Sequence, residues 1–229
     1  MELIEFENAS ALDIALADKV AKLLAADIEA KGAASLVVSG GRTPMAFFHI
    51  LSQQPLDWSK VSISLADERW VDADHADSNE KLVRENLLIN EAHNGHFIGL
   101  KNSSFSAVAG EAEAERALAA IGQFTVLILG MGDDGHTASL FPDAAALPLG
   151  LDTSSGRTCI GVTPTAAPHE RISMTLPRLL DSQQIIIHIS GAGKKQVLDQ
   201  AQSPGDVEVL PIRAILNQQQ APVAIYWAK

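Results

Sequence analysis

Apolar residues recur along this chain at two spacings, one typical of helices and one typical of buried strands. Between Leu12 and Ile28 the apolar side chains repeat every four residues, which predicts an amphipathic helix that ends near Gly32. Ser10 and Asp13 resemble a capping box at the start of this helix. Further helices are expected from Thr43–Pro44 to about 53, from Ser78 to about 88, and over 106–121, 193–202 and 211–219.

Short continuous apolar runs separate the helical segments and are typical of buried strands. They cover residues 35–39, 61–66, 96–100, 124–129, 158–163, 184–190 and 222–227. Strands that alternate with helices predict an α/β fold with a mostly parallel sheet covered on both faces. The stretch 143–157, rich in small residues, is expected to be a loop or lid. We interpret residues 1–229 as one domain, because no linker or repeat divides them.

Charge and composition narrow the class of partner. The chain holds 28 acidic and 17 basic residues, for a net charge of −11, so nucleic acid is not an expected partner. The sequence has neither a run of eighteen apolar residues nor a basic start followed by an apolar stretch, so we expect neither a membrane span nor a secretory signal. Cys159, the only cysteine, lies in an apolar run that favours a buried thiol. A cytoplasmic setting fits these features.

The most distinctive chemistry follows the apolar run 124–129. Segment Gly130–Pro142 opens with three glycines, two aspartates and His136, whose imidazole suits proton transfer near neutral pH. In open α/β sheets, ligands bind at the carboxyl ends of the strands. The glycine spacing also matches the dinucleotide-binding fingerprint, but the two aspartates would stand where a pyrophosphate needs amide groups. The pattern therefore disfavours a nicotinamide oxidoreductase.

Other strand ends bear residues suited to anions. The Ser39–Pro44 turn can present backbone N–H groups and a helix start to a phosphate. Asp67-Glu68-Arg69 follows the next strand and is either a solvated loop or a wall of the active site. Arg171 could hold an anion through two parallel hydrogen bonds, and Lys194 could meet one as a point charge. His75, with the aspartates at 72, 74 and 77, is interpreted as a solvated acidic loop, with a cation site left open.

Together these motifs resemble the 6-phosphogluconolactonase family, within the group that also includes the glucosamine-6-phosphate isomerases. They occur in the family's order over most of the chain. The motifs concerned are Ser39–Pro44, Asp67–Arg69, Ser78-Asn79, Gly130–Pro142, Arg171 before Thr175-Leu176-Pro177, and Gly191 with Lys194.

The resemblance implies a Rossmann-like, three-layer α/β fold shared with glucosamine-6-phosphate deaminase and ribose-5-phosphate isomerase. It also implies hydrolysis of 6-phospho-D-glucono-1,5-lactone to 6-phosphogluconate in the oxidative pentose phosphate pathway, with no cofactor and no metal. In this reaction His136 would act as general base and then acid, oriented by Asp134 or Asp67. Arg69 and loop amides would stabilise the oxyanion. The phosphate would be bound by Ser39, Gly40, Gly41, Arg42, Thr43, Arg171 and Lys194.

Two other functions stay open at this point. Sugar-phosphate deaminases resemble the chain around His136 but continue toward a glutamate, and the corresponding position here is Phe141. That difference disfavours a deaminase or isomerase. A non-enzymatic sugar-phosphate sensor on the same fold could dispense with His136 and Asp67, which are both intact. Whether the protein is a monomer or a homodimer is left open, as is the selectivity between δ- and γ-lactones.

Overall fold

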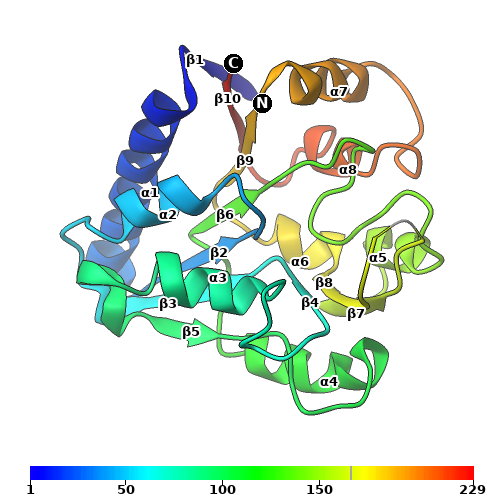
Figure 1. Cartoon of the computed structure of the whole chain (residues 1–229), viewed down its shortest axis with the longest axis horizontal. Coiled ribbons are helices and arrows are strands. Elements are labelled where there is room, and N and C mark those ends of the chain that lie inside the picture. Colours follow the sequence, from blue (N-terminus) through cyan, green and yellow to red (C-terminus); the bar gives the residue numbers. More distant parts are fainter. Residues whose placement is uncertain (166) are drawn as a thin grey trace.

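The computed structural model describes residues 1–165 and 167–229, and its elements are arranged around a parallel sheet (Figure 1). The seven strands lie in the order β1-β10-β9-β6-β2-β3-β5, and all neighbouring pairs are parallel. They are β1 (Glu2–Phe6), β2 (Ala34–Val38), β3 (Val61–Leu65), β5 (His96–Ile98), β6 (Val126–Leu129), β9 (Ile185–Ser190) and β10 (Val223–Ala228). The central strands β9, β6 and β2 are buried and mostly apolar because helices and loops cover both of their faces.

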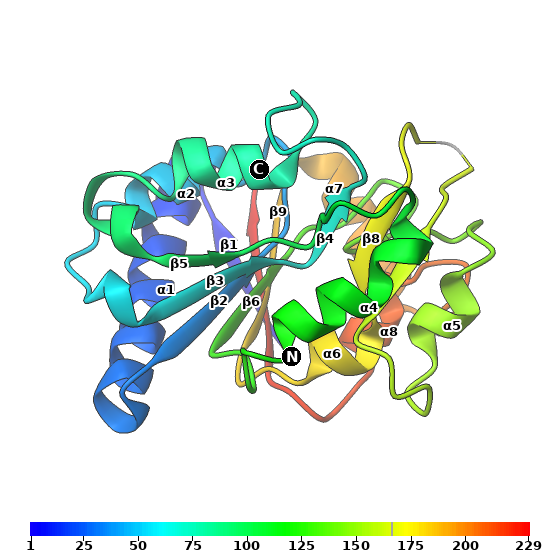
Figure 2. The ribbon, with the colours of Figure 1, turned by 90° about the horizontal axis from the view of Figure 1, so that it is seen from below.

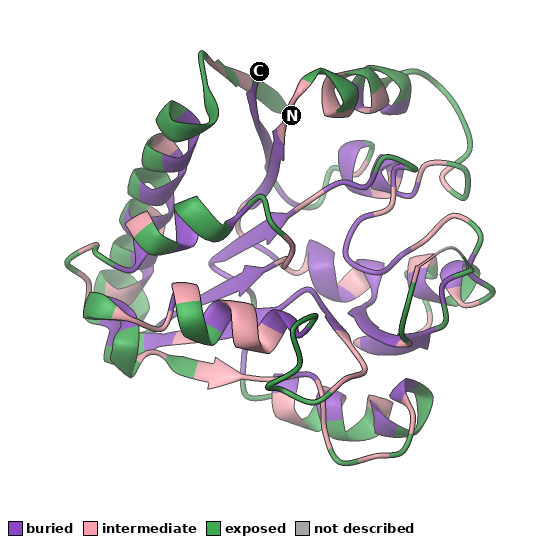
Figure 3. Ribbon diagram, in the orientation of Figure 1, coloured by how far each residue is buried: buried purple, intermediate pink, exposed green. Residues whose placement is uncertain are grey.

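Helices lie on both sides of this sheet, as the sequence pattern predicts. Helix α1 (Ala9–Lys31) packs against β1, β2, β6 and β10, while α6 (Leu176–Leu180) and α8 (Ile212–Leu216) lie on the other side (Figure 2). Helix α1 is exposed on its outer face and buried on its inner face, whereas α6 and α8 are almost entirely buried (Figure 3). The remaining helical elements are α2 (Met45–Leu51), α3 (Asn79–Asn86), α4 (Ala107–Leu118), α5 (Leu147–Leu151), α7 (Ala192–Gln202) and the 3₁₀ turns Trp58–Lys60 and Asn90–Asn94.

A second sheet of three antiparallel strands adjoins the first. It consists of β4 (Asp67–Arg69), β8 (Arg171–Met174) and β7 (Cys159–Val162), and α4 covers it. The expectation that 158–163 belongs to the parallel sheet is therefore wrong. Ala66 joins the two sheets, because its N–H donates to Val38 O at 2.9 Å and its carbonyl accepts from Met174 N at 2.8 Å. Asp67 follows immediately, at the junction.

Four local features differ from the sequence-based expectation. Asn8, not Ser10, caps α1, because its side chain accepts the N–H of Ala11 at 2.9 Å. The short edge strand β1 was not expected, since its exposed glutamates hide the strand pattern. Helix α5 lies within the expected loop 143–157. Arg171 begins a strand and does not merely follow one. By contrast, α1 ends at Gly32, with a φ of 81°, as predicted.

No helix in the described part of the chain is long and apolar enough to cross a membrane. The buried apolar side chains of both sheets belong to one cluster. Cys159 lies within that cluster, where burial, reinforced by nearby Glu115, raises the pKa of its thiol to about 12. The thiol is thus a protonated core group at neutral pH, in line with the expectation from its apolar flanks.

Candidate active site

A cavity of about 270 Å³ lies at the carboxyl ends of the central strands. Strands β2 and β6 are neighbours there. From β2 the chain continues to β3 and β5 on one side, and from β6 it continues to β9 and β10 on the other side. Such a switch point is where doubly wound sheets bind their ligands, because the two following loops diverge. The lining comes from five chain segments and includes Ser39, Gly40, Gly41, Thr43, Asp67, Arg69, Asn79, Gly130–Gly132, His136–Ala138, Arg171, His188–Ser190 and Lys194.

His136 and Asp134 form a hydrogen-bonded pair at the edge of this cavity. His136 Nδ1 lies 2.6 Å from Asp134 Oδ1, which also accepts the backbone N–H of His136 at 3.1 Å. An ionised carboxylate can only accept, so Nδ1 bears the proton in this hydrogen bond and Nε2 is the ring nitrogen left for another partner. Partial burial alone would raise the pKa of Asp134, but the hydrogen bond and charge of His136 lower it overall. Asp134 is therefore an ionised carboxylate that orients the imidazole through Nδ1.

The loop before His136 packs directly against this pair. Gly132 N donates to His136 O at 2.8 Å, and the Thr137 hydroxyl donates to Gly130 O at 2.9 Å. A Cβ at Gly132 would lie 2.1 Å from His136 Nδ1 and 2.4 Å from Asp134 Oδ1. Only glycine permits this approach. The glycine-rich sequence is thus explained by the space that the histidine–aspartate pair occupies.

Phe141 lies against the ring of His136, with 4.3 Å between the ring centroids. This is the position at which the deaminase pattern would have a glutamate. The aromatic ring supplies an apolar contact that limits the orientations of the imidazole, but it has no proton to give or take. Among the residues that the structure describes, Asp134 is the one carboxylate in contact with this histidine.

Arg69 and Arg171 face each other across the pairing of β4 and β8. Arg69 Nη1 donates to Asp77 O at 2.6 Å, and Arg171 Nη2 donates to Pro168 O at 3.2 Å. Within the described part of the chain the Nε atoms of both arginines are buried without a hydrogen-bond partner. Burial lowers the pKa of Arg171, an effect that Asp67 offsets in part and Arg69 reinforces. Arg171 is buried and Arg69 is partly buried, and each guanidinium keeps an N–H donor without a partner, which favours an anionic ligand.

The Ser39–Pro44 turn lines the cavity at the end of β2. A Cβ at Gly40 would lie 1.8 Å from Asn79 Oδ1, so glycine is needed for the turn to pack against α3. Ser39 Oγ is buried and has no hydrogen-bond partner among the described residues. Ser39, Gly40, Gly41 and Thr43 line the cavity, whereas the side chain of Arg42 is exposed and Arg42 is not among the lining residues.

Lys194, near the start of α7, lines the cavity as the sequence suggested. Its ammonium lies 2.6 Å from Asp133 Oδ1, and Asp133 is largely exposed to solvent. An exposed ion pair of this kind is weak, so it leaves Lys194 available to a phosphate.

Asp67 lines the cavity but does not contact the imidazole pair. Its Oδ2 accepts the hydroxyl of Ser139 at 2.5 Å, and its carbonyl accepts Asn79 Nδ2 at 2.9 Å. Its neighbour Glu68 accepts the backbone N–H groups of Asn79 and Glu80 at 2.8 and 2.7 Å. These bonds attach β4 to the start of α3. Of the two carboxylates considered for orienting His136, Asp134 is the one in contact with it.

Asn79 and His188 are among the lining residues that were missing from the sequence-based site. Asn79 is 2% exposed, and its Oδ1 has no partner in the described part of the chain. His188 is buried on β9, with Nε2 at 3.3 Å from Asp13 Oδ1 and its ring edge-on to Phe47. A histidine inside the apolar run 185–190 was a signal that could have found His188. Asn79 was noted only as part of a motif, because its contacts depend on long-range packing.

Comparisons with known proteins agree with this geometry. The protein-family model described as "Glucosamine-6-phosphate isomerases/6-phosphogluconolactonase" matches residues 7–227. A 6-phosphogluconolactonase from Rhizobium meliloti is 46% identical over 224 residues, 97% of each chain. The crystal structure of a 6-phosphogluconolactonase from Shewanella baltica OS155 is 46% identical, with a TM-score of 0.98 over 100% of this chain and 98% of that one. A monomeric glucosamine-6-phosphate deaminase, 17% identical, shares the fold at a TM-score of 0.80 over 98% and 97% of the two chains.

Proposed function

The chain belongs to the family of glucosamine-6-phosphate isomerases and 6-phosphogluconolactonases, and we propose that it hydrolyses 6-phospho-D-glucono-1,5-lactone to 6-phosphogluconate in the oxidative pentose phosphate pathway. The observation that supports this activity most strongly is His136, which is held by Asp134 and lines one cavity with Arg69, Arg171 and Lys194. Hydrolysis of a phosphorylated lactone requires a base to activate water and cationic groups to bind the phosphate.

His136 performs the proton transfers in this proposal. Its Nε2 takes a proton from a water molecule while the water oxygen attacks C1 of the lactone. Asp134 holds Nδ1 and stabilises the imidazolium that results. When the bond between C1 and the ring oxygen breaks, Nε2 returns the proton to the ring oxygen. The products are the open-chain acid and a neutral imidazole, so atoms and protons balance without a co-reactant.

The negative charges of the substrate are expected to bind the cationic side chains that line the cavity, Arg69, Arg171 and Lys194. Negative charge develops on the carbonyl oxygen during attack, and preorganised donors there lower the barrier. We assign this role to Arg69 with backbone amides of the loops that line the cavity. The phosphate is assigned to Ser39, the amides of the 40–43 turn, Lys194 and Arg171. Because Arg69 and Arg171 are cross-strand neighbours, the two assignments must be separated by experiment.

The decisive assay is the disappearance of 6-phosphogluconolactone in the presence of the purified protein, corrected for spontaneous hydrolysis. We expect turnover that is lost in His136→Ala. A matched control is His96→Ala, which removes an exposed histidine from the edge strand β5. Binding of the lactone or of 6-phosphogluconate without turnover would identify a non-enzymatic sugar-phosphate sensor and overturn the proposal.

A further inference from the structure

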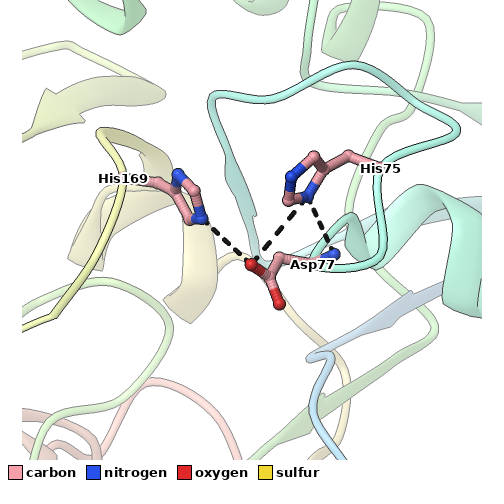
Figure 4. Close-up of side chains that lie close together, drawn as sticks. All are labelled: His75, Asp77 and His169. Carbon is pink, nitrogen blue, oxygen red and sulfur yellow. Dashed lines mark hydrogen bonds and ion pairs between the residues drawn. The ribbon is translucent and has the colours of Figure 1, made fainter.

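Three metal-ligating side chains converge outside the cavity just described. His75 and Asp77 lie on the loop between β4 and α3, and His169 lies on the loop that leads into β8 (Figure 4). One ligand atom from each lies within 4.8 Å of the other two. Asp77 Oδ2 is 3.0 Å from His169 Nε2 and 3.9 Å from His75 Nδ1. None of the three lines the active-site cavity.

We propose that His75, Asp77 and His169 form a binding site for a divalent transition metal, with Zn²⁺ as the best-fitting ion. Two imidazoles and one carboxylate are borderline ligands that suit Zn²⁺ and its first-row neighbours, whereas Ca²⁺ and Mg²⁺ prefer oxygen-only sets. Three protein ligands leave the fourth position of a tetrahedral ion to water. The side chains are partly exposed, so an ion can reach them from solvent.

The distances fit an ion after small side-chain rotations. Ligand atoms at about 2.1 Å from a tetrahedral Zn²⁺ lie roughly 3.4 Å apart, and the separations of 3.0 and 3.9 Å bracket that value. His75 Nδ1 now accepts the backbone N–H of Asp77 at 3.0 Å and would exchange this bond for the metal. The hydrogen bond from His169 lowers the pKa of Asp77, so the carboxylate is already ionised. Both imidazole rings approach this carboxylate (Figure 4).

The location of the cluster gives the ion a structural role. Arg69 donates to the carbonyl of Asp77, and Arg171 donates to the carbonyl of Pro168, next to His169. An ion bound by His75, Asp77 and His169 would therefore join the two loops whose backbone holds these arginines. The ion itself would contact neither arginine and no reacting atom. This inference concerns binding only, so it can fail or succeed independently of the proposed lactonase activity.

The test is a Zn²⁺ titration of the full chain in competition with a chelating dye, after dialysis against a chelator. We expect one Zn²⁺ per chain in the wild type, and binding at least tenfold weaker in His169→Ala, His75→Ala and Asp77→Asn. Matched controls are His93→Ala and Asp74→Asn, which remove an exposed histidine and an aspartate outside the cluster. Both controls should bind like the wild type. Circular dichroism verifies that each variant is folded.

A second measurement does not depend on the variants' stability. The ring-proton NMR signals of His75 and His169 should shift on addition of Zn²⁺, while those of His93 and His96 stay in place.

The site is refuted if Zn²⁺ does not bind the wild type, or if His169→Ala and Asp77→Asn bind it as tightly as the wild type does. It is also refuted if binding is lost in His136→Ala alone, because the ion would then belong to the His136–Asp134 pair.

Discussion

Asp134 Oδ1 accepts two hydrogen bonds from His136, one from ring Nδ1 at 2.6 Å and one from the backbone N–H at 3.1 Å. The carboxylate thus fixes the ring relative to its own backbone. A histidine held in this way loses little conformational entropy when it begins to react, and its Nε2 is the nitrogen left to serve as base.

Removal of the base should abolish most of the turnover without unfolding the protein. His136 is partly exposed, so His136→Ala creates no large buried cavity. General base catalysis contributes on the order of 10²–10⁴-fold, and we expect kcat/KM to fall by that factor. Asp134→Asn, which keeps the size of the side chain but not its charge, should also reduce kcat. Near wild-type rates in folded His136→Ala would eliminate this histidine as the base.

The pH dependence of stability and that of kcat/KM should distinguish the contribution of Asp134 from that of His136. A carboxyl group whose pKa is lowered by folding stabilises the folded state above its unfolded pKa and stops doing so as the pH falls through the folded value. The pKa of Asp134 is lowered from an ordinary value of 3.8, so its contribution to stability disappears only below that pH. Asp134 is therefore ionised from about pH 5 to 8, the range in which imidazoles commonly titrate.

We accordingly expect kcat/KM to decline on the acid side of that range, because the proposed reaction needs a base that can accept a proton from water. The fold should remain intact over the same interval, which circular dichroism can check. A rate profile that is flat from about pH 5 to 8 would contradict the role of a neutral imidazole.

The absence of a side chain at Gly132 should be essential for catalytic activity. In Gly132→Ala the new methyl group would lie 2.1 Å from His136 Nδ1, so the imidazole pair must move. Misplacement of a catalytic group by about 1 Å can cost around 100-fold in rate, and we expect a loss of kcat of that order. Gly122→Ala is the matched control, because a Cβ there meets no atom within 4 Å. Equal activity in both variants would refute the close approach.

The phosphate should account for most of the substrate's binding energy. The chain is strongly acidic, so affinity for an anion must come from the cavity's own donors. A hydrogen bond to a charged group contributes about 1.5–3 kcal/mol, so glucono-1,5-lactone without the phosphate should react at least about 100-fold more slowly. Arg171→Ala should narrow the difference in kcat/KM between the two lactones, because it weakens only the phosphorylated one.

Two further variants sharpen this comparison. Arg171→Lys should restore activity only in part, because a point charge cannot replace a planar guanidinium. Arg84→Ala, an exposed arginine on α3 that pairs with Glu80, should change neither rate. If Arg171→Ala slowed both lactones by the same factor, its role would move from the phosphate to the lactone ring or to folding. Arg69→Ala in the same assay should slow both lactones, as expected for a group that stabilises the oxyanion.

Phe141 should exclude the deaminase reaction. Its ring occupies the space beside His136 where the deaminase pattern would have a carboxylate, and it cannot exchange protons. We expect no release of ammonia from glucosamine 6-phosphate under conditions in which the lactone is hydrolysed. Ammonia release at a rate comparable to lactone hydrolysis would reverse the preference between these two activities.

The local sequence alone was enough to predict the central strands and the reactive residues that follow them. The apolar runs that became β6 and β9 could be recognised because a strand buried on both faces must be continuously apolar. The Gly130–Pro142 segment could be recognised because its glycines, carboxylates and histidine are neighbours in the sequence. The placement of His136, the Ser39 turn and Lys194 around one cavity agrees with the rule that ligands bind at the carboxyl ends of parallel strands.

Only the tertiary structure decided which distant residues meet. The antiparallel pairing that sets Arg69 beside Arg171, the bond from Ser139 to Asp67 and the convergence of His75 and Asp77 on His169 all join segments far apart in the chain. Strand 159–162 likewise belongs to the antiparallel sheet, although it is a short apolar run like those of the central strands. Hydrophobic pattern specifies that a strand is buried, but its partner and register depend on how the remaining layers pack.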